Sequence, residues 1–357
     1  MITIDTLPPF YDSNNARSWS HRPDIAQLHA CAQTWREHYA ISASIEDTIT
    51  LDLMVIDSQN DFCLPNGHLF VAGRSGHGAI DDSQRIAEFI YRNLPYLTRI
   101  IFTLDSHYPL QIFFDSFWIG KDGRCPPPFT TITTDDLRQG IYDINPAVID
   151  LVPPDHAEQA LTWARRQVRY YVEELEHVGK YSLTVWPYHT LIGNTGHALV
   201  GLLDEARLFH SAVRHIQSTI EIKGHHPWSE HYSVFGAEVS GRWDKEQPMI
   251  EKNKPLIDRL IESDGVIFVG QASSHCLMSS VDDLLTEIQQ RNATLSQKIY
   301  VVRDCTSPVC VFGTDGNPLV DFTEQGEAAF ARWAAAGIHI VSSTTPLAQW
   351  PNLDRLG

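Results

Sequence analysis

Residues able to carry out acid–base, nucleophilic or metal chemistry come soon after five of the short apolar runs in this sequence. They are Asp57, Asp105, His107, His189, Lys223 and Cys276. A lone aspartate after a strand is more often a turn former or helix cap than a catalyst, and a lone cysteine is more often a small buried side chain. In a doubly wound sheet, however, ligands bind outside the carboxyl ends of the strands. Five runs that end in reactive residues therefore indicate a shared site.

The apolar runs predict a parallel sheet covered by helices on both faces, because segments rich in β-branched residues alternate with segments of helical periodicity. We expect strands at residues 49–56, 99–104, 182–186, 218–222, 265–269 and 298–302, and a further candidate at 338–342. We expect helices at residues 81–94, 156–177, 197–215, 254–263, 277–291 and 324–336. The predicted fold is a three-layer αβα fold with a doubly wound, mainly parallel six-stranded sheet.

Two stretches fall outside this alternation. One is an N-terminal extension over residues 1–48, and the other is a long insertion over residues 115–180 that contains three consecutive prolines at 126–128. The rest fits one α/β domain, so we expect a single domain over residues 1–357. The insertion emerges beside Asp105 and His107, and we expect it to cover the site or to form a contact in a homo-oligomer.

Charge and composition limit the partners and the location of the protein. The formal net charge of -17 disfavours nucleic acid and anionic membranes as partners, but not a small neutral substrate. No apolar run approaches the roughly 20 residues of a membrane span, and the N-terminus lacks the features of a signal peptide. The cytoplasm is therefore the expected location. The six cysteines lack paired CxxC spacing, which argues against a disulfide framework or a zinc knuckle.

Five sequence motifs surround the reactive residues and follow one another along the chain. They are DSQNDF at 57–62, TLDSH at 103–107, WPYH at 186–189, KG at 223–224 with YS at 232–233, and GQA at 270–272 before Cys276. With these motifs the chain resembles the nicotinamidase branch of the isochorismatase-like cysteine hydrolases, over about residues 48–346 outside the insertion. The resemblance implies the isochorismatase-like hydrolase fold, a catalytic acid/base at Asp57, a catalytic lysine at Lys223 and a nucleophile at Cys276. It also implies a cis peptide bond between Gln271 and Ala272.

These residue types suit amide hydrolysis through a covalent intermediate. Asp57 can accept the thiol proton of Cys276, and Lys223 can keep Asp57 ionised and stabilise developing negative charge. Cys276 also opens the helix expected from residue 277, whose N-terminus lowers a thiol pKa. By resemblance, the amides of Ala272 and Cys276 form the oxyanion hole. We therefore expect an amidohydrolase that converts nicotinamide to nicotinate and ammonia, an activity of NAD salvage.

The resemblance also implies that Asp105, His107 and His189 bind a metal ion. Asp105 and His107 are two residues apart in an extended segment, so both side chains can point the same way, and His189 arrives from another strand. Two imidazoles and a carboxylate suit Zn²⁺, our first expectation, and the same set suits Fe²⁺ or Mn²⁺. The resemblance places water and the pyridine nitrogen of the substrate at the open positions. Phe62 is our candidate for contact with the substrate ring.

The chain departs from the family pattern at two positions near the site. Thr190 stands where the family commonly has a cysteine, and Gln111 stands where it has a histidine, so the substrate pocket is less firmly implied than the chemistry. One alternative is a carbamoyl or ureido amidase of the same superfamily, a branch that generally lacks the metal triad. Another is a non-catalytic binding or scaffold protein that retains the pocket. Isochorismatase itself is disfavoured because its relatives lack the nucleophilic cysteine.

Overall fold

The computed structural model describes residues 4–178, 181–245, 247–313 and 316–354. At its centre is a six-stranded sheet in the order β12–β9–β8–β1–β2–β7, with every neighbouring pair parallel. The strands are β1 (Leu51–Ile56), β2 (Arg99–Asp105), β7 (Thr219–Lys223), β8 (Gly265–Gly270), β9 (Ile299–Val302) and β12 (His339–Val341). The chain runs from β1 outwards to β7 and then returns to β8 on the other side of β1. The strand order therefore reverses between β1 and β8, where doubly wound folds bind ligands.

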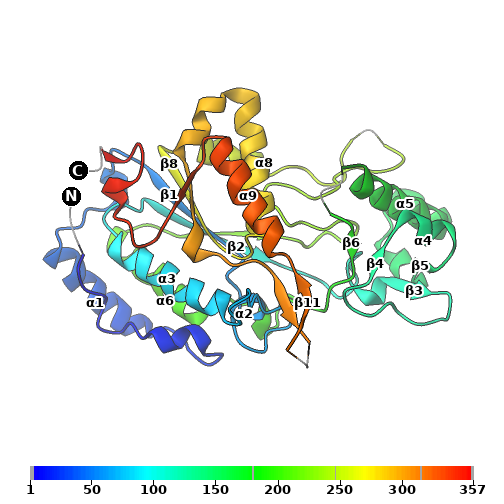
Figure 1. Cartoon of the computed structure of the whole chain (residues 1–357), viewed down its shortest axis with the longest axis horizontal. Coiled ribbons are helices and arrows are strands. Elements are labelled where there is room, and N and C mark those ends of the chain that lie inside the picture. The colour runs from blue at the N-terminus through cyan, green and yellow to red at the C-terminus, as the bar shows by residue number, and fades with distance from the viewer. Residues whose placement is uncertain (1–3, 179–180, 246, 314–315, 355–357) are drawn as a thin grey trace.

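Helices cover both faces of this sheet (Figure 1). On one face α3 (Gly78–Arg92) packs against α6 (Gly201–Arg214), and α1 (Ile25–His38) packs against α6 from outside. The other face carries α8 (Cys276–Arg291) and α9 (Thr323–Ala335), with α7 (Lys254–Glu262) against α8. Every residue of β1, β8 and β9 is buried, as expected for strands covered on both faces. The predicted three-layer, doubly wound fold is confirmed.

One predicted strand of the sheet is wrong. Within residues 182–186 only β6 (Leu183–Thr184) is a strand, and it pairs antiparallel with β4 (Thr131–Ile132) of the insertion. The sheet position beside β2 is taken by β7, so this apolar run contributes to the insertion instead. The further candidate at 338–342 supplies the sixth strand as β12. The six predicted helices are present with ends within four residues of the predicted ones, whereas α1 in the N-terminal extension was not predicted.

The insertion folds into a small unit of its own, at the end of the molecule opposite the two termini in Figure 1. It contains β3 (Trp118–Gly120), α4 (Thr134–Arg138), β5 (Tyr142–Ile144) and the long helix α5 (Ala160–Val178), in addition to β4. β3 pairs antiparallel with β5, and α4 packs against α5. Residues 179–180, the predicted end of the insertion, lie outside the described residues.

Three short elements border the carboxyl edge of the sheet. They are α2 (Asn60–Cys63), directly after β1, and the antiparallel hairpin of β10 (Cys310–Phe312) and β11 (Pro318–Asp321). Within the described parts of the chain, none of the helices combines the length and the apolar character needed to cross a membrane.

Candidate active site

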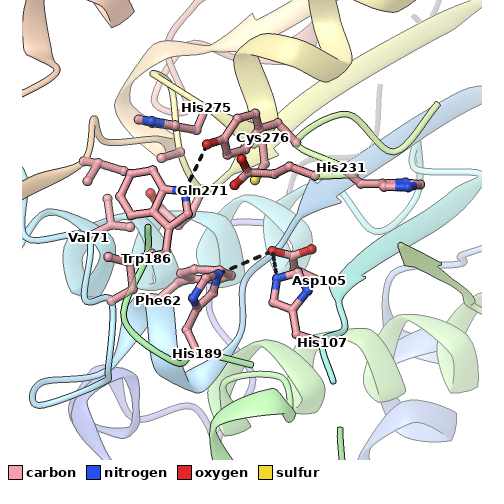
Figure 2. Close-up of a pocket in the computed structure, with 15 residues that line it drawn as sticks. Phe62, Val71, Asp105, His107, Trp186, His189, His231, Gln271, His275 and Cys276 are labelled. Atoms are coloured by element: carbon pink, nitrogen blue, oxygen red, sulfur yellow. Dashed lines mark hydrogen bonds and ion pairs between the residues drawn. The ribbon is translucent and has the colours of Figure 1, made fainter. Parts of the chain in front are cut away.

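The predicted site residues converge at the carboxyl ends of β1, β2, β7 and β8. Asp57 follows β1 with a positive φ of 41°, Asp105 and Lys223 are the last residues of β2 and β7, and Cys276 is the first residue of α8. All four side chains are buried. Asp105 and Cys276 line one pocket with about 490 Å³ of space not occupied by atoms, shown in Figure 2, and Asp57 and Lys223 lie behind them in contact with these two residues. Residues from separate motifs of the sequence therefore lie together.

Lys223 is at the centre of the reactive cluster. Its Nζ lies 2.8 Å from Asp57 Oδ2 and 2.9 Å from Asp105 Oδ1. It also donates to the backbone oxygen of His231 at 2.9 Å, and it lies 3.7 Å from Cys276 Sγ. One ammonium group thus links the predicted acid/base, the predicted nucleophile and one predicted metal ligand.

Burial and charge set the protonation states of this cluster. Burial lowers the pKa of Lys223, but Asp105 and Asp57 more than offset it, so this pKa lies well above the ordinary lysine value. Burial raises the pKa of Asp57, and Lys223 opposes this increase. Burial also raises the pKa of the Cys276 thiol well above its ordinary value, again against the effect of Lys223. Lys223 is therefore charged, and the thiol needs a base before it can act as a nucleophile.

Asp57 is held so that it can serve as that base. Its backbone N–H donates to Thr103 Oγ1 at 2.9 Å, and the Thr103 hydroxyl donates back to Asp57 Oδ1. The other carboxylate oxygen faces Lys223, and a carboxylate oxygen of Asp57 lies within 4.8 Å of Cys276 Sγ. Because both oxygens are fixed, the carboxylate is aimed at the sulfur without further rearrangement.

Asp105, His107 and His189 form a second cluster beside Lys223, with one possible ligand atom of each within 4.8 Å of the others. Nδ1 of His107 lies 2.9 Å from the carbonyl oxygen of Gly224, and Nδ1 of His189 lies 2.7 Å from that of Pro187. Since a carbonyl oxygen only accepts, both Nδ1 atoms carry the hydrogen. The two Nε2 atoms, which face Asp105 Oδ2, are then the nitrogens that a metal ion would take as ligands.

The charges in this second cluster suit a metal ion. His107 Nε2 lies 2.9 Å from Asp105 Oδ2, and His189 Nε2 lies 3.9 Å from the same oxygen (Figure 2). Burial and His107 lower the pKa of His189 to about 4, so that ring is neutral at pH 7. Burial alone would raise the pKa of Asp105, but His107 and Lys223 hold it well below its usual range, so Asp105 is ionised. A neutral imidazole, as at His189, and an ionised carboxylate, as at Asp105, are forms that coordinate a divalent cation.

Gly224 makes the close packing of this cluster possible. Its φ is +84°, a left-handed conformation, and a Cβ atom there would lie 2.4 Å from Asp105 Oδ1 and 2.8 Å from His107 Cε1. Its carbonyl oxygen accepts from His107 Nδ1 and also from Gln111 Nε2, at 2.7 Å. Only glycine allows the backbone to approach the predicted metal ligands this closely.

The remaining predicted residues border the pocket. Phe62 lines it, with its ring centroid 5.4 Å from that of His189, and Ala272 lines it beside Cys276. The peptide bond between Gln271 and Ala272 is cis, as expected from the resemblance. The oxyanion role of the Ala272 and Cys276 amides and the substrate contact of Phe62 remain predictions.

Several residues that line the pocket were not assigned a role from the sequence. They are Leu69, Val71, Trp186, Glu230, His231, Tyr232, Gln271, His275 and Val309. Trp186 and Tyr232 lie within the quoted motifs, and Trp186 Nε1 donates to the Tyr232 hydroxyl at 3.1 Å. No periodicity marks Glu230 and His231, because an irregular loop after β7 carries them to the pocket.

The fold is similar to that of solved nicotinamidases. The yeast nicotinamidase Pnc1p bound to the inhibitor nicotinaldehyde matches with a TM-score of 0.50 and 21% identity, over 82% of this chain and 100% of that one. Another structure of Pnc1p has a TM-score of 0.48 and 20% identity and covers 82% of this chain and 99% of that one. An Acinetobacter baumanii nicotinamidase/pyrazinamidase has a TM-score of 0.47 and 19% identity and covers 84% of this chain and 99% of that one. No protein-family model and no curated protein matches the sequence. The chain thus has the isochorismatase-like hydrolase fold that the motifs implied.

Proposed function

We propose that this protein is an amidase that hydrolyses the carboxamide of a small molecule, with nicotinamide as its substrate and nicotinate and ammonia as the products. The observation that carries this proposal is the position of Lys223. Its ammonium group, buried beside the pocket that Cys276 lines, lies 2.8 Å from Asp57 Oδ2 and 3.7 Å from Cys276 Sγ. An acid/base, a thiol and a fixed positive charge are the groups that acyl transfer from an amide requires.

In the proposed reaction, Asp57 takes the thiol proton as Cys276 Sγ attacks the carbonyl carbon, which gives a tetrahedral intermediate. Lys223 and the N-terminus of α8 stabilise the negative charge that develops. Asp57 then returns the proton to the departing nitrogen, so ammonia leaves and a thioester remains on Cys276. Asp57 next takes a proton from water as the water oxygen attacks the thioester carbon. The C–S bond then breaks, the carboxylic acid leaves, and Asp57 returns the proton to Cys276 Sγ.

Asp105, His107 and His189 would hold one divalent metal ion, with Zn²⁺ as the proposed metal. The convergence of two Nε2 atoms on an ionised carboxylate fits such an ion. When bound, the metal would supply a Lewis acid that can orient a ring nitrogen or a water molecule.

The aromatic walls of the pocket support a flat ring as the substrate. Phe62, Trp186 and Tyr232 line the pocket together with Cys276 and the predicted metal ligands. The similarly folded Pnc1p is a nicotinamidase, and its structure contains nicotinaldehyde, a close analogue of nicotinamide. A carbamoyl amidase would also use Cys276, but it would not need the metal cluster. We further propose that residues 1–48 and 115–180 are additions to a single domain.

The proposal is tested by measuring ammonia release from nicotinamide and from an N-carbamoyl amino acid, with metal content determined on the same preparation. We expect turnover of nicotinamide, about one metal ion per chain, and loss of both metal and turnover in His189→Ala. A zinc-supplemented protein that hydrolyses neither compound would refute the amidase proposal. Metal-free hydrolysis of the carbamoyl compound alone would identify the other branch.

A further inference from the structure

Helix α5 of the insertion packs one row of side chains against the loop that follows β7. Trp163, Gln167 and Tyr171 recur at intervals of four residues, so they lie on one face of the helix. All three are buried. All three bear polar groups that must find hydrogen-bond partners in the interior. These partners lie in the loop over residues 224–245: Trp163 Nε1 donates to the carboxylate of Asp244 at 3.1 Å, and the other two side chains bond the loop backbone.

Gln167 fixes the part of this loop around Gly241 and Trp243, two residues that do not line the pocket. Its Nε2 donates to the carbonyl oxygen of Gly241 at 3.2 Å, and its Oε1 accepts from the N–H of Trp243 at 3.3 Å. Helix α5 and the loop approach so closely that a Cβ atom on Gly241 would lie 2.3 Å from the hydroxyl oxygen of Tyr170. The buried amide is satisfied only while the loop follows this path.

Tyr171 fixes the part of the loop that reaches the pocket. Its hydroxyl oxygen accepts from the backbone N–H of Glu230 at 3.2 Å. Glu230 and the next two residues line the pocket. The carbonyl of the next residue, His231, accepts from Lys223 Nζ at 2.9 Å. A short chain of hydrogen bonds and backbone therefore leads from the insertion to the central ammonium group.

We propose that α5 is a positioning element for the reactive cluster and that Tyr171 is the residue through which it acts. This inference rests on the proposed amidase function, since Lys223 must be placed between Asp57 and Cys276 for that chemistry. Tyr171 holds the backbone N–H of Glu230, and the next residue, His231, supplies one of the three oxygen acceptors of Lys223. The insertion thereby acts as a fixed support behind the pocket wall.

The test compares two isosteric variants, Tyr171→Phe and Gln167→Met. Each removes hydrogen bonds between α5 and the loop, but only Tyr171 bonds a residue that lines the pocket. We expect kcat/KM for nicotinamide to fall about tenfold in Tyr171→Phe, mainly through kcat, because small displacements of catalytic groups cost up to about 10²-fold. Gln167→Met should retain wild-type kcat. Rates are expressed per Cys276 that can be alkylated, so that unfolded protein is not counted.

Hydrogen exchange of the peptide around residues 229–232 provides a second measurement that does not depend on turnover. Protection there should fall in Tyr171→Phe and persist in Gln167→Met. Wild-type kcat in Tyr171→Phe, or an equal loss of kcat in Gln167→Met, would overturn the inference. If the wild type hydrolyses no amide, the proposed function fails. Unchanged exchange at 229–232 in Tyr171→Phe would then still overturn the positioning role, and faster exchange would support it.

Discussion

Replacing Gly224 by alanine should disturb the metal cluster far more than the same change at another left-handed glycine. The matched control is Gly193, which has a φ of +87° and open space around the position of a Cβ atom. Both variants place an L-residue in the left-handed region, which costs about 1–2 kcal/mol of folding stability. At Gly224 the new Cβ would also lie 2.4 Å from Asp105 Oδ1, whereas real Cβ contacts essentially never fall below 3.0 Å. Asp105 or the backbone must therefore shift by about 0.6 Å.

A shift of this size moves Asp105, a predicted metal ligand. It also weakens the hydrogen bond from His107 Nδ1 to the carbonyl oxygen of Gly224, which orients the His107 ring. Loss of comparable supporting contacts lowers metal affinity by about 10- to 100-fold, so we expect Gly224→Ala to bind Zn²⁺ that much more weakly. Gly193→Ala should bind like the wild type while losing similar backbone stability. The measurement is a competitive chelator titration of the metal-free proteins, with urea unfolding in parallel. Equal affinities in the two variants would refute the assigned geometry, and an absence of Zn²⁺ binding by the wild type would refute the site itself.

Three further predictions concern the thiol, its base and acid stability. Cys276→Ala should remove turnover while urea unfolding changes by less than about 1 kcal/mol, since little packing volume is lost; residual turnover above about a thousandth of wild type would exclude the thioester. Asp57→Asn should slow the alkylation of Cys276 by iodoacetamide, because an amide cannot accept the thiol proton, and an unchanged rate would exclude Asp57 as the base. Burial lowers the pKa of His210 from 6.5 to about 4 in the fold. Its stability contribution is therefore full above pH 6.5 and falls as the pH drops towards 4, by about 3 kcal/mol in all. Urea unfolding between pH 7 and 4.5 should show a shallower loss in His210→Gln, and equal slopes would contradict this pKa.

The reactive residues other than His189 could be predicted from the sequence because each lies at or just after the end of a strand or at the start of a helix. The burial of β1 and β8 is encoded in continuous apolar runs, and parallel strands bring their carboxyl ends to one edge. Asp57 and Cys276 are therefore placed by local pattern and topology together. The run at 182–186 has the same apolar character, but its pairing depends on which strand occupies the sheet position beside β2, and that strand is β7. The composition of the run alone does not determine this pairing.

The pocket wall was predicted less well, for a related reason. Glu230 and His231 lie on an irregular loop that is hydrogen-bonded to α5, a helix about sixty residues earlier in the chain. The sequence does predict α5, but it carries no signal for the surface that α5 covers. The polar residues Gln167 and Tyr171 on α5 are the sequence feature that corresponds to its contact with the loop after β7, because a buried amide and a buried hydroxyl need partners outside the helix.

Gln111 shows how a departure from the family pattern can be understood once the structure is known. It stands where the resemblance has a histidine, and the sequence left its role open. Its Nε2 donates to the carbonyl oxygens of Gly224 and His226 at 2.7 and 3.0 Å, and its Oε1 accepts from the N–H of Tyr108 at 3.0 Å. The side chain thus spans the segment after β2 and the segment after β7. Because Gly224 also accepts from His107, Gln111 supports a predicted metal ligand through the backbone, which a histidine with a single donor could not do at both carbonyls.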